Sequence, residues 1–189
     1  MKVVKKEEFL SEKEFYINEM KAGKVFVYGT DTIYGIGCNA LSSEGVLKIR
    51  RIKQRDEKPF SVIAPSKKWI SENCFVSGIA QRWVDKLPGA YTLILELNNW
   101  NVVSPETNGG GSTLGVRIPK HWFSDIISES GVPFVTTSVN LTGQKGIQGL
   151  SDLSEDMRKE IDYFVDEGVI EGEGSTVVKL VGDEEEILR

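Results

Sequence analysis

Two spacings of apolar residues recur along the chain, and together they predict a series of helices and strands. Residues 7–22 and 43–53 carry apolar side chains at near-helical intervals; in the second segment Val46, Ile49 and Ile52 fall on one face. Shorter helices are expected at residues 66–74, 79–87, 121–130 and 151–160. Short apolar runs predict buried strands at residues 25–28, 60–64, 91–97, 114–118 and 133–137.

The closing part of the chain predicts two more strands, at residues 162–168 and 175–182, which we expect to pair antiparallel with each other. The acidic tail, residues 183–189, is expected to fray or to pair at a sheet edge. Helices and strands intermix without repeats or linkers, which is typical of an α/β domain. The pattern therefore predicts a single domain over residues 1–189, built on a twisted, mixed sheet.

The composition narrows the class of protein. The chain has 189 residues, of which 40% are hydrophobic and 27% charged, enough to bury an ordinary core. The apolar runs are far shorter than a membrane span, and acidic residues occupy the place of a signal-peptide core. We therefore expect a cytoplasmic protein with no membrane partner. A net charge of −5 argues against non-specific binding to nucleic acid but leaves room for a local basic cleft.

Histidine and cysteine are scarce in this chain. His121 is the only histidine, so a multi-histidine metal site is impossible, and a Ser-His-Asp triad could use only this residue, where a helix start is the preferred interpretation. Cys38 and Cys74 are too few for a disulfide framework; we expect both to be buried, although a reactive Cys38 would be possible with a base beside it. No direct metal-ligand cluster is expected, and any chemistry should depend on Lys, Arg, Ser, Thr and Asn with a soluble metal ion.

Polar side chains follow two of the expected strands. The stretch TDTIYGIG, residues 30–37, follows the strand at 25–28, and TTSVN, residues 136–140, ends the strand at 133–137. Ligands in open α/β sheets bind beyond the carboxyl ends of strands, and Gly143 and Gly146 would let backbone N–H groups face an anion. Taken alone, the first stretch is better explained as a turn capped by Asp31.

Cations gather at two further places. Lys53, Arg55 and Lys58 lie at a helix end, where they would offset the helix dipole or clamp a polyphosphate. Thr113 precedes a strand that contains Arg117, which would face either solvent or a carboxylate in a cleft. Considered together, the hydroxyl and cation clusters suggest one cleft that is rich in donors for anions and poor in bases. That inventory favours phosphate chemistry by positioning and electrostatics.

Five motifs in this order, TDTIYGIG, KQR…KPF, LGVRIP, TTSVN and STVV, resemble the YrdC-like threonylcarbamoyl-AMP synthase family in its short, single-domain form. The resemblance spans residues 23–180 and implies a mixed α/β domain with a large concave ligand cleft. It implies that L-threonine, bicarbonate or CO2, and ATP react to give threonylcarbamoyl-AMP and pyrophosphate. The product would feed the t6A modification beside the tRNA anticodon, completed by a separate transferase complex.

The resemblance also implies roles for individual residues. Those implied to hold the ATP phosphates with Mg2+ and to carry the catalysis are Lys53, Arg55, Ser138 and Asn140. Further ATP contacts are implied at Lys58, Thr113 and Gly146. Residues implied to bind threonine are Thr32, Tyr34, Arg117, Thr136 and Ser175, with Arg117 suited to the carboxylate. Residue 29 is glycine, where the family usually has proline.

Three alternatives stay open. The chain could be a YrdC-like paralogue that binds RNA and has weak or different nucleotide activity, although such members tend to lose the S-x-N or K-x-R pattern that this chain keeps. It could be a pure RNA-binding module. It could also be a carbamoyl-transfer domain of the hydrogenase-maturation type, whose extra zinc-finger-like and acylphosphatase-like segments we do not find. If the chain is a synthase, we expect tRNA or the tRNA-modifying transferase complex as a candidate direct partner.

Overall fold

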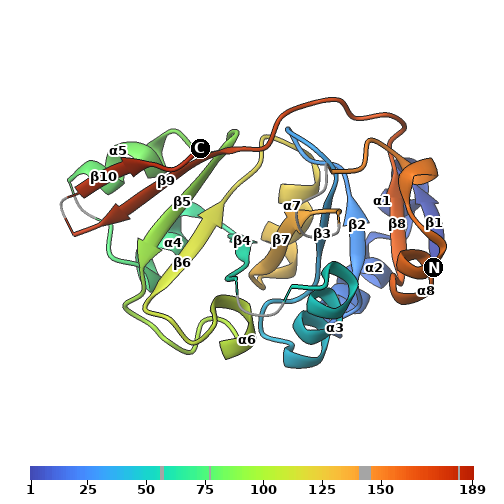
Figure 1. Ribbon diagram of the computed structural model, residues 1–189, viewed down its shortest axis with the longest axis horizontal. Coiled ribbons are helices and arrows are strands. Elements are labelled where there is room, and N and C mark those ends of the chain that lie inside the picture. Colours follow the sequence, from blue (N-terminus) through green and yellow to red (C-terminus); the bar gives the residue numbers. More distant parts are fainter. Residues whose placement is uncertain (56–57, 77, 141–145, 183) are drawn as a thin grey trace.

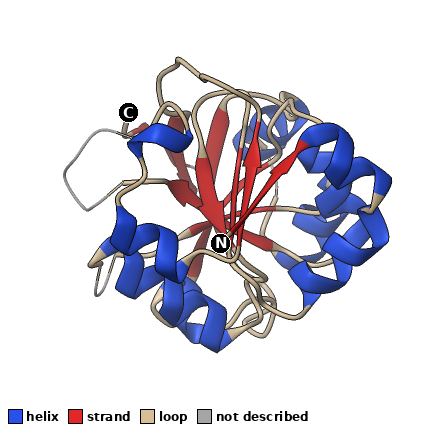
Figure 2. Ribbon diagram, turned by 90° about the vertical axis from the view of Figure 1, so that its right-hand side faces the viewer, coloured by secondary structure: helices blue, strands red, loops and turns tan. Residues whose placement is uncertain are grey.

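The computed structural model describes residues 1–55, 58–76, 78–140, 146–182 and 184–189. Within these residues, ten strands join in one mixed sheet, in the order β1-β8-β2-β3-β7-β4-β6-β5-β9-β10. The sheet extends along the long axis of the molecule, and helices lie on both sides of it (Figures 1 and 2). The α/β class and the mixed sheet predicted from the sequence are therefore confirmed.

One half of the sheet surrounds the strand that precedes the TDT motif. β2 (Phe26–Tyr28) pairs antiparallel with β3 (Gly35–Gly37) and parallel with β8 (Tyr163–Asp166). β8 also pairs parallel with the edge strand β1 (Lys2–Lys5). The helices that go with this half are α1 (Lys6–Ser11), α2 (Lys13–Lys21), α3 (Ser43–Lys53), α7 (Phe123–Ser130) and α8 (Glu155–Glu160).

The other half begins where β7 (Phe134–Ser138) pairs antiparallel with both β3 and β4 (Ser61–Ile63). From β4 the sheet continues through β6 (Thr113–Arg117), β5 (Tyr91–Glu96), β9 (Thr176–Val181) and the edge strand β10 (Glu184–Ile187). The shorter helices of this half are α4 (Lys67–Asn73), α5 (Ile79–Asp85) and α6 (Pro105–Asn108).

The strands separate two apolar clusters because successive side chains of a strand point to opposite faces. In β2, Val27 packs in the larger cluster, whereas Phe26 and Tyr28 pack in the smaller one. The larger cluster receives the apolar face of α3 that the sequence predicts. The smaller cluster receives α1, α2 and α7. Burying both faces explains why these strands read as continuous apolar runs.

The structure corrects several expectations about individual elements. The predicted helix at residues 7–22 is two helices that break at Glu12, where φ is −113°. The strand β1, the strand β3 and the short helix α6 were not predicted. β3 was not predicted because it is a Gly-Ile-Gly run, and its single apolar side chain gives no strand pattern. A Cβ atom at Gly37 would lie 1.9 Å from the Val135 carbonyl oxygen, so only glycine lets β3 pack this closely against β7.

The two closing strands do not pair with each other, which contradicts the sequence-based expectation. β8 pairs with β1 and β2, whereas β9 pairs with β5 and β10 in the other half. The segment that joins them, residues 167–175, crosses the molecule from one half to the other (Figure 1). Part of the acidic tail does pair at a sheet edge, as β10. Over the described ranges, no helix has both the length and the apolarity to cross a membrane.

Candidate active site

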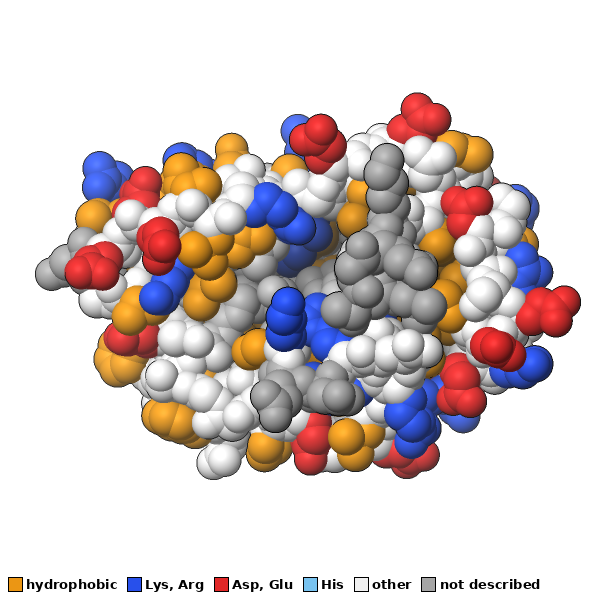
Figure 3. All heavy atoms as spheres, viewed as in Figure 1, with side chains coloured by type: hydrophobic (Ala, Val, Ile, Leu, Met, Phe, Trp, Pro, Cys, Tyr) orange, Lys and Arg blue, Asp and Glu red, His pale blue; other side chains and the backbone are white. Residues whose placement is uncertain are grey.

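A cavity of about 390 Å³ lies where the two halves of the sheet meet, and we call it the central cavity. Lysine and arginine side chains gather around a hollow at this place in the space-filling view (Figure 3). Residues from both strand-end motifs line the cavity together with Arg117 of β6 and residues of the segment before β9. The predicted site residues that line it are Thr32, Tyr34, Arg55, Arg117, Thr136, Ser138, Asn140, Gly146 and Ser175.

The TDT motif forms a tight turn that presents Thr32 to the cavity. The Thr30 hydroxyl oxygen accepts hydrogen bonds from the backbone N–H groups of Thr32 and Ile33, at 3.1 and 3.2 Å, and the hydroxyl donates to the Ile33 carbonyl at 2.7 Å. The hydroxyl oxygens of Thr30 and Thr32 lie 2.9 Å apart. Thr30 therefore folds the turn, and Thr32, which is buried, completes the wall of the cavity.

Arg117 is held by the same turn. Its Nη2 donates to Asp31 Oδ1 at 2.7 Å, and Asp31 Oδ2 accepts from the backbone N–H of Lys120 at 2.8 Å. Burial lowers the pKa of Arg117, and the Asp31 carboxylate opposes that shift. The Arg117 Nε atom is buried and finds no hydrogen-bond partner among the described residues. The guanidinium thus lines the cavity with donor capacity left for an anion.

Lys53 lies beneath the S-x-N motif rather than on the cavity surface. Its side chain is almost fully buried, and its ammonium donates to Asn140 Oδ1 at 2.7 Å, to the Asn140 carbonyl at 3.0 Å and to the Ser138 carbonyl. The Ser138 hydroxyl donates to Asn140 Oδ1 at 2.7 Å. Burial, with a smaller contribution from the charge of Arg55, lowers the pKa of Lys53 to about 8. Lys53 therefore holds the S-x-N backbone in place.

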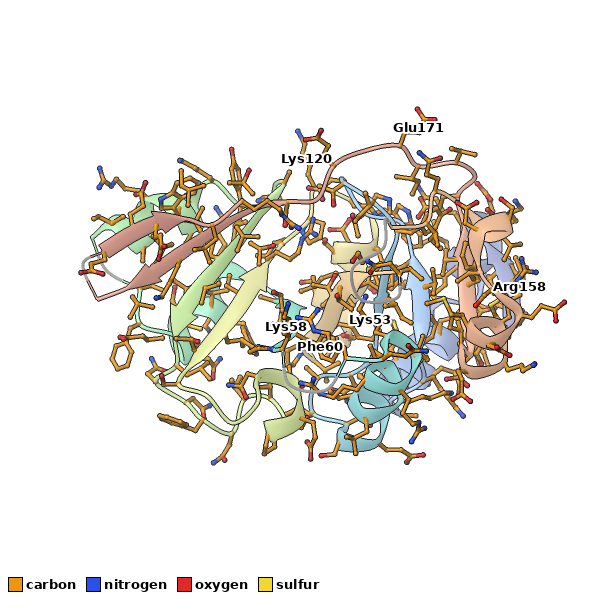
Figure 4. All side chains as sticks on the ribbon, viewed as in Figure 1. Lys53, Lys58, Phe60, Lys120, Arg158 and Glu171 are labelled. Carbon is orange, nitrogen blue, oxygen red and sulfur yellow. The ribbon has the colours of Figure 1, made fainter. Side chains whose placement is uncertain are left out.

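Arg55 lines the cavity but uses part of its guanidinium to fold its own loop. Nε donates to the Lys58 carbonyl at 3.1 Å, and Nη2 donates to the Pro59 carbonyl. The guanidinium carbon lies 4.9 Å from the centre of the Phe60 ring. Lys58, which is labelled in Figure 4, is exposed and does not line the cavity. Thr113, the first residue of β6, does not line it either.

The β8–β9 connection closes one side of the cavity. The Tyr34 hydroxyl donates to the Gly168 carbonyl at 2.8 Å and accepts from the Glu167 N–H at 3.0 Å, and burial raises the pKa of Tyr34 to about 12. Further along, a Cβ atom at Gly172 would lie 2.1 Å from the Thr32 carbonyl oxygen. The connection is therefore packed directly on the TDT turn.

Three polar side chains of the cavity were missed by the sequence analysis. Thr92 lies in β5, and its hydroxyl oxygen is 2.7 Å from that of Ser175. Arg189 donates from Nε and Nη2 to the Ser175 carbonyl, at 3.1 and 3.0 Å. Ser61 is the first residue of β4. Each is a single polar residue in an apolar or acidic segment, so nothing in the local pattern marks it.

The remaining candidates for chemistry are inert or lie elsewhere. Cys38 and Cys74 are buried and unpaired, and burial raises the pKa of both thiols. The Nε2 atom of His121 lies 3.2 Å from Glu167 Oε2, outside the cavity. Over the described part of the chain, no group of His, Cys, Asp and Glu side chains could hold a metal ion. Gly143 lies outside the described residues. The cavity is thus a set of donors for anions, with no adjacent base and nucleophile among the residues described.

Comparisons with known proteins show the family of the chain. A family model described as "Telomere recombination", whose name joins Sua5, YciO and YrdC, matches residues 18–189. A Methanocaldococcus jannaschii relative is 34% identical over 176 residues, which are 90% of this chain and 81% of the relative. A Bos taurus relative named threonylcarbamoyl-AMP synthase is 32% identical over 173 residues, which are 87% of this chain and 62% of the relative.

A solved structure supports the same family. The crystal structure of P. abyssi Sua5 complexed with L-threonine matches with a TM-score of 0.85 and 26% identity, over 99% of this chain and 56% of that chain. This chain therefore spans little more than half of the P. abyssi protein and about three fifths of the bovine one. Since the family model covers all but the first 17 residues, the chain belongs to the Sua5/YciO/YrdC family.

Proposed function

We propose that this chain is an L-threonylcarbamoyl-AMP synthase, which joins L-threonine, bicarbonate or CO2, and ATP and releases pyrophosphate. The observation that carries the proposal is the placement of a buried arginine with a spare donor, Arg117, in the same cavity as Arg55 and the S-x-N motif. A small amino acid and a polyphosphate could thus bind side by side. The threonine complex of P. abyssi Sua5 and the name of the bovine relative support this assignment.

In the proposed complex, Arg117 binds the threonine carboxylate through the donors that Asp31 leaves free. Hydroxyl groups that face the same part of the cavity would surround the rest of the amino acid; they belong to Thr32, Thr136 and Ser175. The ring of Tyr34 completes this wall, since its hydroxyl is engaged with the β8–β9 connection. The threonine site would therefore consist of one cation and several short donors.

The phosphate groups of ATP would meet Arg55, Ser138 and Asn140, with the backbone at Gly146 nearby. Lys53 supports this region from below, and Lys58 and Thr113 would reach ATP only beyond the cavity as it is described. Mg2+ would neutralise phosphate charge; hydroxyl and amide oxygens suit this ion, but Asn140 Oδ1 already accepts from Lys53 and Ser138. The phosphates and the Ser138 hydroxyl would thus be its main ligands.

The reaction needs no nucleophile from the protein. The threonine amine adds to CO2 and loses a proton, which gives a carbamate; a carbamate oxygen then attacks the α-phosphorus of ATP as the bond to pyrophosphate breaks. The protein would have to orient the two substrates, neutralise phosphate charge and exclude water from the labile carbamate. A cavity lined by donors and cations, with no base at its centre among the described residues, fits these tasks.

The proposal extends to partners and location. We propose that residues 1–189 act as one functional domain, because a single sheet joins both sides of the cavity. A role in t6A synthesis would place the protein in the cytoplasm and hand its product to a tRNA-modifying complex, with direct tRNA contact as an option. The cations around the cavity are the observation that favours the RNA-binding paralogue as a second candidate.

The test is to measure AMP and pyrophosphate formation with threonine and bicarbonate present, and with each omitted in turn. We expect turnover only with both, and we expect Arg117→Met to raise the KM for threonine far more than that for ATP. ATP turnover that ignores threonine would exclude the synthase. If instead tRNA binds tightly at physiological salt while AMP formation is absent, the second candidate is favoured.

A further inference from the structure

Arg50 lies outside the central cavity, yet it is bonded to the segment that carries Arg55. It belongs to the last turn of α3. Its Nε and Nη2 atoms both donate to the Glu106 carbonyl in α6, at 3.0 and 2.6 Å. Two donors on one acceptor fix the plane of the guanidinium, because the fork can rotate only by breaking one of them.

The third guanidinium nitrogen of Arg50, Nη1, binds backbone carbonyl oxygens at and just after the K-x-R motif. Nη1 donates to the Arg55 carbonyl at 3.2 Å and to the Lys58 carbonyl at 3.4 Å. These two carbonyls lie on either side of the residues that connect Arg55 to Lys58. Arg50 therefore connects α6 to both described ends of that segment, and the backbone of Arg55 cannot shift without disturbing it.

The two arginines also share an aromatic ring. The guanidinium carbons of Arg50 and Arg55 lie 4.7 and 4.9 Å from the centre of the Phe60 ring, which is 2% exposed. Figure 4 shows Phe60 beside Lys58 and near Lys53, at the middle of the molecule. Ring and guanidinium attract each other, so Phe60 offsets part of the repulsion between two cations that are this close.

The repulsion between the two guanidinium groups affects the pKa of Arg55. Burial, and then the charge of Arg50, lower the pKa of Arg55. Two partly desolvated guanidiniums beside the cavity create a strong positive potential that an incoming polyphosphate would relieve. Arg55 donates from Nε and Nη2 to the carbonyl oxygens of Lys58 and Pro59. The direction of its remaining donors therefore depends on the position of this part of the backbone.

We propose that Arg50 is a positioning residue, which holds Arg55 in the orientation that meets the phosphate groups of ATP. This inference rests on the proposed function, because it takes the phosphates to bind at Arg55. A purely structural role, in which Arg50 only joins α3 to α6, would alter stability without a selective effect on ATP.

The experiment compares Arg50→Met and Arg50→Lys with Arg51→Met, a matched control at an exposed residue of the same helix. ATP affinity is measured by calorimetry, the KM values for ATP and threonine by AMP release, and stability by thermal unfolding. We expect both Arg50 variants to weaken ATP binding about tenfold and the threonine KM to change less than about twofold, because lysine keeps the charge but cannot fork on the Glu106 carbonyl. Arg51→Met should bind ATP like the parent protein.

A double-mutant cycle with Arg55→Met separates positioning from a general effect. If Arg50 acts through Arg55, Arg50→Met causes no further loss of ATP affinity in the Arg55→Met background. Additive losses, full rescue by Arg50→Lys, or equal effects on both substrates would overturn the inference. If the parent protein binds no ATP, both proposals fail. If it binds ATP but shows no threonine-dependent AMP release, only the synthase fails, and the Arg50 cycle is still decided by ATP affinity.

Discussion

Asp31 and Arg117 form a largely buried ion pair, with 2.7 Å between Oδ1 and Nη2 and side-chain exposures of 12% and 8%. The first residue belongs to the TDT turn and the second to β6, so the pair joins the two halves of the sheet at the cavity. The second Asp31 oxygen accepts from the Lys120 N–H. One carboxylate thus sets both the charge balance and the orientation of the arginine that we assign to threonine.

Asp31→Asn should destabilise the protein and weaken threonine binding. Asparagine keeps the shape but leaves the Arg117 charge buried without compensation, so the free energy of unfolding should fall by about 3 kcal/mol. The KM for threonine should rise, because the guanidinium is no longer oriented. Denaturant unfolding and AMP-release kinetics measure the two effects, with Asp125→Asn, an exposed residue of α7, as the control. Unchanged stability would show that the pair is not formed in solution.

Lys53 should make activity decline at alkaline pH. Burial and the charge of Arg55 lower its pKa from 10.5 to about 8. Above that pH the amine loses the charge with which it holds the Ser138 and Asn140 carbonyls, so the alignment of the S-x-N motif should weaken. We expect the pH–rate profile to show an alkaline limb near pH 8, which is lost in Lys53→Arg because arginine stays protonated.

The stability of the same protein should move in the opposite direction. Between about pH 8 and pH 10.5 the unfolded chain binds more protons at Lys53 than the folded chain does. The free energy of unfolding therefore rises with pH across this window through Lys53, and the unfavourable contribution is fully present below about pH 8. Lys53→Met should lack this rise. Parallel stability curves for the parent and Lys53→Met would contradict the lowered pKa.

Gly172→Ala should affect the threonine site more than the fold. Its Cβ atom would lie 2.1 Å from the Thr32 carbonyl oxygen, so the exposed β8–β9 connection must move away from the TDT turn. Stability should drop by less than about 1 kcal/mol, while the KM for threonine rises. Gly149→Ala is the control, because the nearest atom to its new Cβ would be 3.6 Å away. Equal effects of the two substitutions on KM would refute the argument.

Gly29→Ala should destabilise the protein through Glu167. The new Cβ atom would lie 2.4 Å from Glu167 Oε1, and this carboxylate cannot easily withdraw, since its other oxygen accepts from Trp122 Nε1 at 2.7 Å and faces His121. Overpacking of this kind costs about 1–3 kcal/mol. In a Glu167→Ala background the cost should shrink, which thermal unfolding of the four variants would show.

Local pattern was enough to place most elements of this protein. The apolar face of α3, the buried runs that became β2, β5, β6 and β7, and the clustering of hydroxyl groups at strand ends are all visible without coordinates, because they follow from the periods of helices and strands. The motifs TDT, K-x-R, S-x-N and Arg117 were also visible. Of these motif residues, Lys53 lies under the S-x-N backbone, and its expected contact with the phosphates stays a prediction.

Two of the missed elements, β3 and α6, have a common cause. β3 is mostly glycine and α6 is four residues long, so neither produces an apolar period. The pairing of β8 and β9 was mispredicted because adjacency in sequence does not decide which sheet edge offers free hydrogen-bonding groups. Thr92 and Arg189 belong to the site because they contact Ser175, and no local sequence pattern predicts these long-range contacts.

The amino-acid sequence by itself therefore determined the class of fold, the family and the types of side chain available for chemistry, since these depend on local periodicity and on motifs of a few residues. Only the tertiary structure decided which of those side chains meet. Contacts such as Asp31 with Arg117, Gly172 with Thr32 and Arg50 with the Arg55 loop depend on long-range strand order and close backbone packing, which are settled by the whole sheet at once.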